Sequence, residues 1–314
     1  MVALWFLGHG FWLTRPSLAL AQAGQVESPA LDAQALTLPT RSGAFSTFSA
    51  SHPQPGLRAA ARASSVLYPL TLRLASGDPD GTKSAAIQHA PSLELAASYQ
   101  LAWGLDFGLA LGMQLGQTGE GLSAVTGQEA RLAAVGARDP RAEIGFSWLR
   151  KATSVRPFLA ALLPLGSKEA LSSEQRARLQ GGMTGEVELK HLRAGAEISL
   201  LYRKAVEVGS VRWGSQLRMA GALMAETGQL SFGPELVIAP ILSRQPGTGT
   251  VIVAAEAMFT SSYQFSNWRL SASVGGGLPT SRVGTAERNP SLVRGPSAPL
   301  FRFLAGLSFA LPEP

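Results

Sequence analysis

The residues that could do chemistry are charged side chains placed within otherwise apolar stretches. Glu94, for example, stands between Leu93 and Leu95 in a segment where every second residue is apolar. Alternation with period 2 puts the two sets on opposite faces of a β-strand. A charge facing lipid near the bilayer midplane would cost about 2–4 kcal/mol, so we expect these charges to face a lumen. The predicted lumen residues are Arg73, Glu94, Asp106, Glu143, Arg156, Glu186, Glu188, Glu197, Arg203, Arg212, Arg218, Glu235, Glu256, Arg269 and Arg302.

Two interpretations of these charges remain open. They could form a charged constriction that selects ions or solutes, or a mutually neutralising network that holds a narrow lumen shut. The near-equal numbers of the two signs favour the network. A turn at His191-Leu192 would set Lys190 opposite Arg193 and Glu186 opposite Glu197. Such like-charged pairs need a third partner, and Arg212 or Arg218 is the candidate.

The sequence gives little support for catalysis or cofactor binding. Of the histidines, His9, His52 and His191 fall in the N-terminal segments or in a turn. Only His89, near Ser92, could serve a nucleophile, and no orienting acid is evident. We therefore expect no enzyme, no cofactor and no metal site; residues 78–81 (Asp-Pro-Asp-Gly) predict a bare turn, and residues 275–277 (three glycines) a strand end. The net charge of +6 comes from dispersed basic residues, which argues against nucleic-acid binding.

The elements that must position the charges are best seen in residues 91–116, PSLELAASYQLAWGLDFGLALGMQLG. Apolar residues alternate with small or polar ones on either side of a break near Ala102. Each half is about ten residues long, which is the length that a tilted strand needs to cross a bilayer. One apolar face and one small or polar face are typical of a transmembrane barrel strand.

Similar segments recur to the end of the chain and predict about twelve strands, between ten and fourteen. Short gaps, such as residues 102–103 and 151–153, alternate with long ones, such as residues 165–180 and 278–298. Tight periplasmic turns and long extracellular loops alternate in this way. The prediction is an all-β fold, a transmembrane antiparallel up-and-down β-barrel of the outer-membrane type over residues 65–310, with both termini in the periplasm.

The N-terminal part lacks such periodicity. Residues 1–13 are apolar, and Ala21-Gln22-Ala23 matches a signal-peptidase site, so residues 1–23 are predicted to be a signal peptide. Residues 24–64 are rich in Pro, Ser, Ala and Gln and predict a flexible periplasmic lead-in. The sequence leaves open whether this lead-in plugs the barrel. Residues 311–314 are predicted to form a short tail.

The last strand, LFRFLAGLSF at residues 300–309, resembles the C-terminal signal that hands outer-membrane proteins to the barrel-assembly machinery. Further segments, VGARDPRAEIGFSW, FLAALLPLGS and LRAGAEISLLYRK, resemble the barrel half of the outer-membrane protein A family. The resemblance implies a location in the bacterial outer membrane. It implies as partners the membrane lipid and, through Phe301–Phe309, the assembly machinery. This chain stops at the barrel, so the family's cell-wall anchoring is not expected.

The predicted function is a passive pore or transport protein with a charge-lined lumen. The alternative is a closed structural or surface-interaction barrel that acts through its long loops, residues 117–140 and 278–298. An autotransporter unit is discounted because residues 24–64 are too short for a passenger domain.

Overall fold

The computed structural model describes residues 39–41, 43–53, 55–74, 82–122, 132–208, 211–243, 253–278 and 299–312. The predicted signal peptide, the turn at residues 78–81 and most of the loop at residues 278–298 lie outside the described residues. Within the described ranges, no helix has the length and apolar character needed to cross a membrane.

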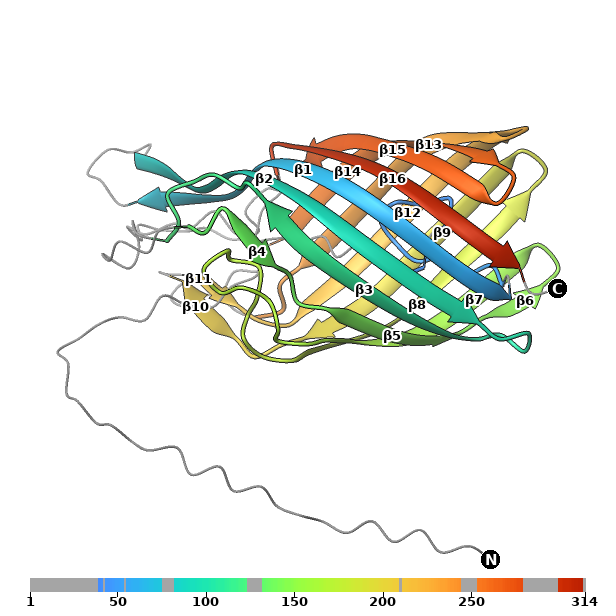
Figure 1. The fold of residues 1–314 in the computed structure, drawn as a ribbon, viewed down its shortest axis with the longest axis horizontal. Coiled ribbons are helices and arrows are strands. Elements are labelled where there is room, and N and C mark those ends of the chain that lie inside the picture. Colours follow the sequence, from blue (N-terminus) through green and yellow to red (C-terminus); the bar gives the residue numbers. More distant parts are fainter. Residues whose placement is uncertain are drawn as a thin grey trace, which may run out of the picture.

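Twelve antiparallel strands close into a barrel, which confirms the predicted fold class (Figure 1). Closure comes from β1, which pairs with both β2 and the last strand, β16. The wall strands are β1 (Gly56–Leu74), β2 (Thr82–Gln100), β3 (Leu105–Leu115), β5 (Arg141–Phe146), β7 (Thr153–Leu162), β8 (Arg178–Leu189), β9 (Leu192–Tyr202), β12 (Gln216–Thr227), β13 (Leu230–Pro240), β14 (Val253–Phe265), β15 (Trp268–Gly277) and β16 (Phe301–Pro312).

Four short strands accompany this wall. β4 (Val135–Ala137) pairs with β3, and β6 (Trp148–Arg150) pairs with β7, so both continue the line of β5. β10 (Val206–Val208) and β11 (Val211–Trp213) form a separate hairpin. Figure 1 shows β4, β10 and β11 at the end of the barrel that carries the longer connections.

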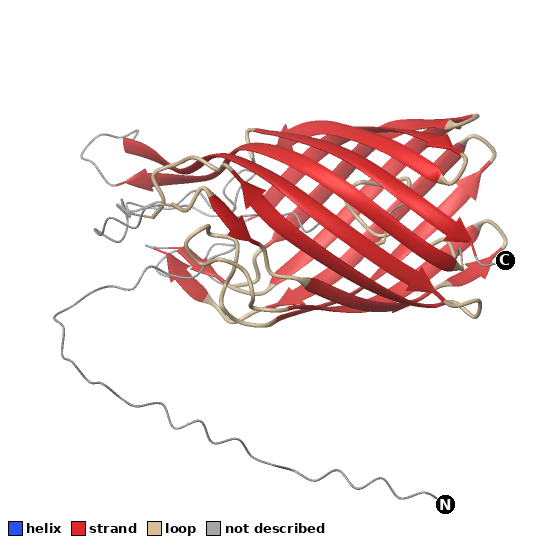
Figure 2. Cartoon of the chain, in the orientation of Figure 1, coloured by secondary structure: helices blue, strands red, loops and turns tan. Residues whose placement is uncertain are grey.

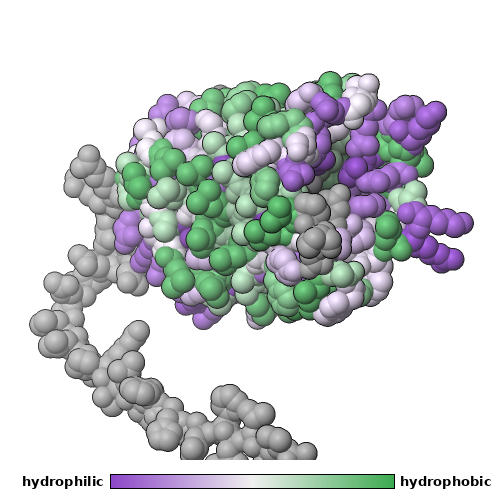
Figure 3. Space-filling view, turned by 45° about the vertical axis from the view of Figure 1, so that its right-hand side comes forward, coloured by the Kyte–Doolittle hydropathy of each residue, from purple (hydrophilic) through white to green (hydrophobic). Residues whose placement is uncertain are grey.

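Alternating residue types build the two faces of the wall. In β3, Phe107, Leu109 and Leu111 are exposed on the outside, whereas Asp106 and Gln114 are buried inside. Apolar side chains consequently form a broad band over the outer surface (Figure 3). A band of this kind is what a lipid-facing barrel requires.

Tight turns gather at one end of the barrel, where Lys190-His191 joins β8 to β9. In this register Glu188 lies opposite Arg193 and Thr184 lies opposite Glu197. The predicted opposition of Lys190 to Arg193, and of Glu186 to Glu197, is therefore wrong. The turn begins one residue earlier than expected, which moves each partner by two positions and leaves every side chain on its predicted face.

The barrel starts earlier than predicted, since β1 begins at Gly56 rather than at residue 65. The expected lead-in of residues 24–64 is therefore too long. Alanines at alternate positions of residues 57–64 gave a weak apolar signal, although Arg58 and Ser64 point inward and are buried. At the C-terminus, β16 extends to Pro312, so residues 311 and 312 of the expected tail are strand.

The first hairpin is irregular. It joins β1 to β2, which begins at Thr82. Pairing between β1 and β2 shifts between Leu67 and Leu72, and Tyr68 has a positive φ of 51°. At this irregularity Tyr68 is exposed, whereas Val66 and Leu70 on either side of it are buried inside.

Candidate functional site

The residues just before β1 fold back inside the barrel. We call residues 39–41 and 43–53 the lumen segment; in Figure 2 it is a loop enclosed by the strands, near the end with the tight turns. Its side chains are deeply buried: Arg41 and Phe48 are each 1% exposed and Ser51 is 0% exposed. The segment predicted to be a flexible lead-in therefore occupies the lumen in this structure.

Arg41 binds one side of the wall. Its Nη1 donates to Ser147 Oγ at 2.8 Å and lies 3.4 Å from Asp106 Oδ2. Its Nη2 donates to Gln100 Oε1 at 2.8 Å and, within the segment, to the carbonyl of His52 at 2.6 Å. One guanidinium thus ties both ends of the lumen segment to β2 and β3.

A carboxylate on β13 binds the middle of the lumen segment. Glu235 Oε1 accepts from the Ser46 N–H at 2.9 Å and from Ser46 Oγ at 2.9 Å. Glu235 Oε2 accepts from the Thr47 N–H at 3.0 Å and from Thr47 Oγ1 at 2.6 Å. Hydrogen bonds to a charged acceptor are about twice as strong as neutral ones, so this is the segment's most concentrated polar contact.

An aromatic pair flanks that contact. The rings of Phe45 and Phe48 stack with their centroids 4.5 Å apart. They pack against buried apolar side chains from the inner faces of β12, β13, β14 and β16, namely Ala220, Met224, Val237, Met258 and Leu304. We call these five wall residues, with Glu235, the apolar arc.

The C-terminal part of the segment binds β7 and β8. Ser51 Oγ lies 2.8 Å from Ser154 Oγ, and the Ser51 N–H donates to Glu186 Oε1. His52 Nδ1 is 3.7 Å from Glu188 Oε1. Around the wall, β8 and β7 are three and four strands from β13, and the Arg41 partners on β3 and β2 are six and five strands from it. The segment therefore spans the interior instead of lining one wall.

Two glycines in the wall make room for the segment. A Cβ atom on Gly108 would lie 2.8 Å from Thr40 Oγ1, and one on Gly195 would lie 2.6 Å from Phe45 Cζ. A side chain at either position would force its neighbour to move. The wall is thus shaped to fit the segment.

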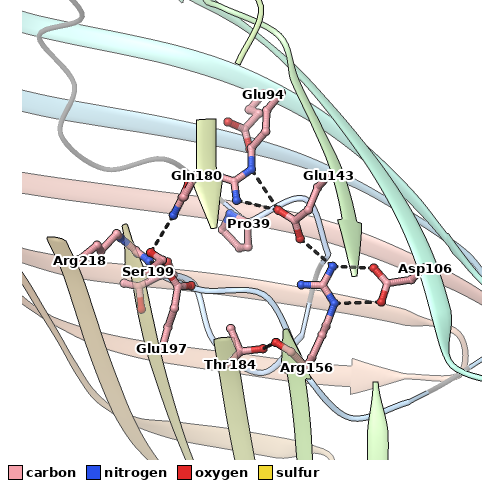
Figure 4. Close-up of polar contacts among 12 residues, drawn as sticks. Pro39, Glu94, Asp106, Glu143, Arg156, Gln180, Thr184, Glu197, Ser199 and Arg218 are labelled. Carbon is pink, nitrogen blue, oxygen red and sulfur yellow. Dashed lines mark hydrogen bonds and ion pairs between the residues drawn. The ribbon is translucent and has the colours of Figure 1, made fainter. Parts of the chain in front are cut away.

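Charged residues of the wall form a continuous network that begins on β3, β5 and β7, away from the apolar arc, and reaches the arc at β12. Arg156 binds both oxygens of Asp106, at 2.9 and 2.5 Å, and Glu143 Oε1 at 2.7 Å. Arg141 binds Glu143 Oε2 at 2.6 Å. From there the network runs through Gln180, Ser199 and Glu197 to Arg218 (Figure 4). We call this chain of side chains, from Asp106 to Arg218, the arginine network.

The structure separates the predicted lumen residues into groups. Buried on the inner face are Glu94, Asp106, Glu143, Arg156, Glu186, Glu197, Arg203, Arg218, Glu235, Glu256 and Arg302. Glu188 and Arg269 are partly exposed near the tight turns. The side chain of Arg73 is not among those described.

Arg212 was placed wrongly. It lies on β11, outside the wall, where its side chain is 50% exposed and 3.9 Å from Glu207. Of the two candidate partners for Glu197, only Arg218 pairs with it. The assignment to the lumen fails because β11 ends at Trp213 and the wall strand β12 starts only at Gln216.

Sequence reasoning missed several inward-facing arginines: Arg41, Arg141 and Arg178, which are buried, and Arg62, which is partly buried. Arg141 begins a strand whose alternation was recognised, so period 2 could have found it. Arg62 lies in the alanine-rich start of β1 and binds Glu94 at 3.1 Å. Arg41 has no periodic context, and nothing in the sequence indicates its role.

The end opposite the tight turns is covered by a second apolar cluster. It consists of Leu70, Ala86, Ile87, Ala90, Leu122, Leu171 and Trp213. Below it, Arg178 binds Asp139 at 2.9 Å, and Arg203 binds Glu174 at 2.6 Å. His89, considered as a nucleophile's partner of Ser92, instead lies 2.8 Å from Ser65 Oγ.

Comparison with known proteins identifies the fold and no family. No protein-family model matches the chain, and no curated protein matches it. Among solved structures, an outer membrane channel from Pseudomonas putida F1 is similar with a TM-score of 0.56 and 12% identity, covering 83% of this chain and 97% of that one. The KdgM porin in complex with oligogalacturonate follows with a TM-score of 0.48, 10% identity and coverage of 81% and 99%. The likeness to the first of these shows that the chain has the fold of an outer-membrane β-barrel.

Proposed function

We propose that this protein is a transport channel of the bacterial outer membrane and that the lumen segment closes it. Three findings support a membrane location: the barrel fold, the apolar outer band and the likeness to a solved outer membrane channel. In this proposal the tight turns and both termini lie on the periplasmic side, because outer-membrane barrels have short periplasmic turns. The solutes then cross through the charge-lined interior.

One observation carries the idea of a closed channel. The described contacts of the lumen segment with the wall are noncovalent, among them the hydrogen bonds to Glu235 and Glu186 and the ion pair of Arg41 with Asp106. Asp106 and Glu186 keep arginine partners in the wall without it, Arg156 and Arg193 respectively. Most of the wall charges therefore stay paired when the segment leaves, and the barrel keeps its structure.

The alternative is a permanently closed barrel that acts through its loops. The apolar cluster around Trp213 and Leu171 favours it, because this cluster covers the other end of the lumen. The two functions differ in whether current flows once the lumen segment is free.

A disulfide can decide between them, because the chain contains no cysteine. The hydroxyl oxygens of Ser51 and Ser154 are 2.8 Å apart, so a Ser51→Cys/Ser154→Cys pair is close enough to bridge. The measurement is single-channel conductance of the refolded protein in a planar bilayer. We expect steady steps from the reduced double variant and loss of these steps on oxidation.

The single variants Ser51→Cys and Ser154→Cys are the matched controls and should not respond to oxidation. A folded double variant that is silent both when reduced and when oxidised would reject transport and favour the closed barrel.

The finer expectations from the sequence remain proposals. They are insertion by the barrel-assembly machinery through Phe301–Phe309, contact with outer-membrane lipid, absence of catalysis and absence of nucleic-acid binding. Membership of the outer-membrane protein A family also stays a prediction. The twelve strands differ from the eight that are usual for small barrels of that type.

A further inference from the structure

The apolar arc combines two properties that rarely occur together inside a barrel. Met224, Val237, Met258 and Leu304 are each no more than 5% exposed and give it an apolar surface. Glu235 stands among them, since its register neighbours are Ala222 on β12 and Met258 on β14. A carboxylate is thus set within an apolar wall.

Among the described residues, Glu235 has no ion pair with a basic side chain. The other buried carboxylates of this side of the barrel differ, because Glu256 binds Arg302 at 2.9 Å and Glu197 binds Arg218. A buried carboxylate without hydrogen-bond donors is very costly. Whatever fills the space above Glu235 must therefore supply donors, and it must also cover the apolar side chains.

The lumen segment meets both needs. Ser46 and Thr47 give Glu235 two N–H groups and two hydroxyls, and Phe45 and Phe48 cover the apolar side chains. Arg218 in addition donates to the carbonyl of Thr47. In chemical terms, the site accepts an aromatic ring joined to a group of strong donors.

We propose that the apolar arc is the channel's solute site for small organic cations that carry an aromatic ring, and that residues 45–48 occupy it in the closed channel. This inference rests on the proposed transport function. An ammonium group supplies the donors that Glu235 requires, and the ring replaces those of Phe45 and Phe48. An aromatic anion is repelled by Glu235, and an inorganic cation makes no use of the apolar wall.

Solute and lumen segment then compete for one site. A solute that binds only when residues 45–48 are displaced shifts the population toward the open channel. Its apparent affinity falls with the fraction of molecules in which the site is free. Weakening the segment's own contacts therefore strengthens solute binding, which is the opposite of what a merely structural role for these residues would give.

The test uses the full chain in detergent micelles, with 2-phenylethylammonium as probe, the neutral 2-phenylethanol as its matched analogue and 3-phenylpropionate as the anion. Binding is measured by isothermal titration calorimetry. We expect the cation to bind at least about tenfold more tightly than the alcohol, because a hydrogen-bonded charge pair contributes that much. The anion should bind more weakly than both.

Two variants separate solute recognition from general damage. Glu235→Gln should bring the ratio of the affinities for the cation and the alcohol close to one. This ratio is independent of how strongly the segment competes, because the segment competes with both probes equally. Phe45→Ala/Phe48→Ala should raise the affinity for both cation and alcohol, because it weakens the competitor. Resistance of the folded barrel to SDS at room temperature checks that each variant is intact.

Equal binding of cation, alcohol and anion, or an unchanged affinity ratio in Glu235→Gln, would overturn the solute site. Lower affinity in the double phenylalanine variant would overturn the competition. Both results are independent of the conductance measured with the disulfide pair. A conducting channel without cation binding rejects this inference alone, and cation binding without conductance rejects transport alone.

Discussion

The buried carboxylates on the two sides of the barrel interior have different kinds of partner. The arginine network neutralises its carboxylates with arginines of the wall itself, as Arg156 does for Asp106 and Glu143. The apolar arc instead leaves Glu235 to the lumen segment. The carboxylates of the arginine network keep arginine partners when the segment is absent, whereas Glu235 has its hydrogen-bond donors only when the segment is bound. The difference indicates that the network stabilises the wall itself, and it is the reason why we propose the arc as the binding site for a displaceable group.

The largest expected effect tests the arginine network. Arg156→Met leaves Asp106 with Arg41 and Glu143 with Arg141, both buried, and removes the arginine that joins them. Breaking one partner of a buried charge network costs about 3–5 kcal/mol. We expect this loss in the free energy of unfolding, measured by urea titration in detergent micelles. A loss below 1 kcal/mol would mean that the network is not what stabilises this side.

A smaller effect is expected where the arc meets the segment. Gly195→Ala places a Cβ atom 2.6 Å from Phe45 Cζ and should displace the aromatic pair, at a cost of about 1–3 kcal/mol. The barrel should stay folded while the segment is released, which proteolysis of the N-terminal residues would detect. Gly185→Ala on β8 is the matched control, because its Cβ would lie 3.7 Å from the nearest atom. Equal protease resistance of the two variants would contradict this prediction.

Arg218 joins the two sides, since it binds Glu197 in the network and the carbonyl of Thr47 in the segment. Arg218→Gln should weaken segment docking by about 1.5–3 kcal/mol, the range for a hydrogen bond to a charged group. Open probability in the planar bilayer is the readout, and it should rise. No change in the currents would show that Thr47 does not need Arg218.

The smallest effect is expected outside both regions. Arg212 is half exposed and lies 3.9 Å from Glu207, and exposed ion pairs contribute about 0–1 kcal/mol. Arg212→Gln should therefore change neither the unfolding free energy nor the open probability. It serves as the charge-matched control for Arg218→Gln. An effect of equal size on the open probability in the two variants would contradict a specific role for the contact between Arg218 and Thr47.

Periodicity predicted the wall well because lipid on one side and lumen on the other impose strict alternation on each strand. It failed where alternation stops or weakens. Arg212 was wrongly assigned to the lumen because the hairpin of β10 and β11 interrupts an apparent strand. The start of β1 was not recognised as strand because alanine fits either face. The lumen segment could not be predicted at all. Its fit to Gly195, Glu235 and Ser154 depends on side chains from distant strands that meet only after the barrel has closed.

The connection of the lumen segment to β1 at Gly56 has a consequence for its release. A segment of about fifteen residues spans at most roughly 50 Å when extended, so a freed segment stays tethered near the end of the barrel with the tight turns. Its return is intramolecular and proceeds at an effective concentration in the millimolar range. Diluting the protein therefore does not hold the segment away from its site, and the loss of a single contact between segment and wall does so only briefly. In the proposed channel, the tether therefore favours the closed state, and an occupant of the site or a change in the segment itself would prolong opening.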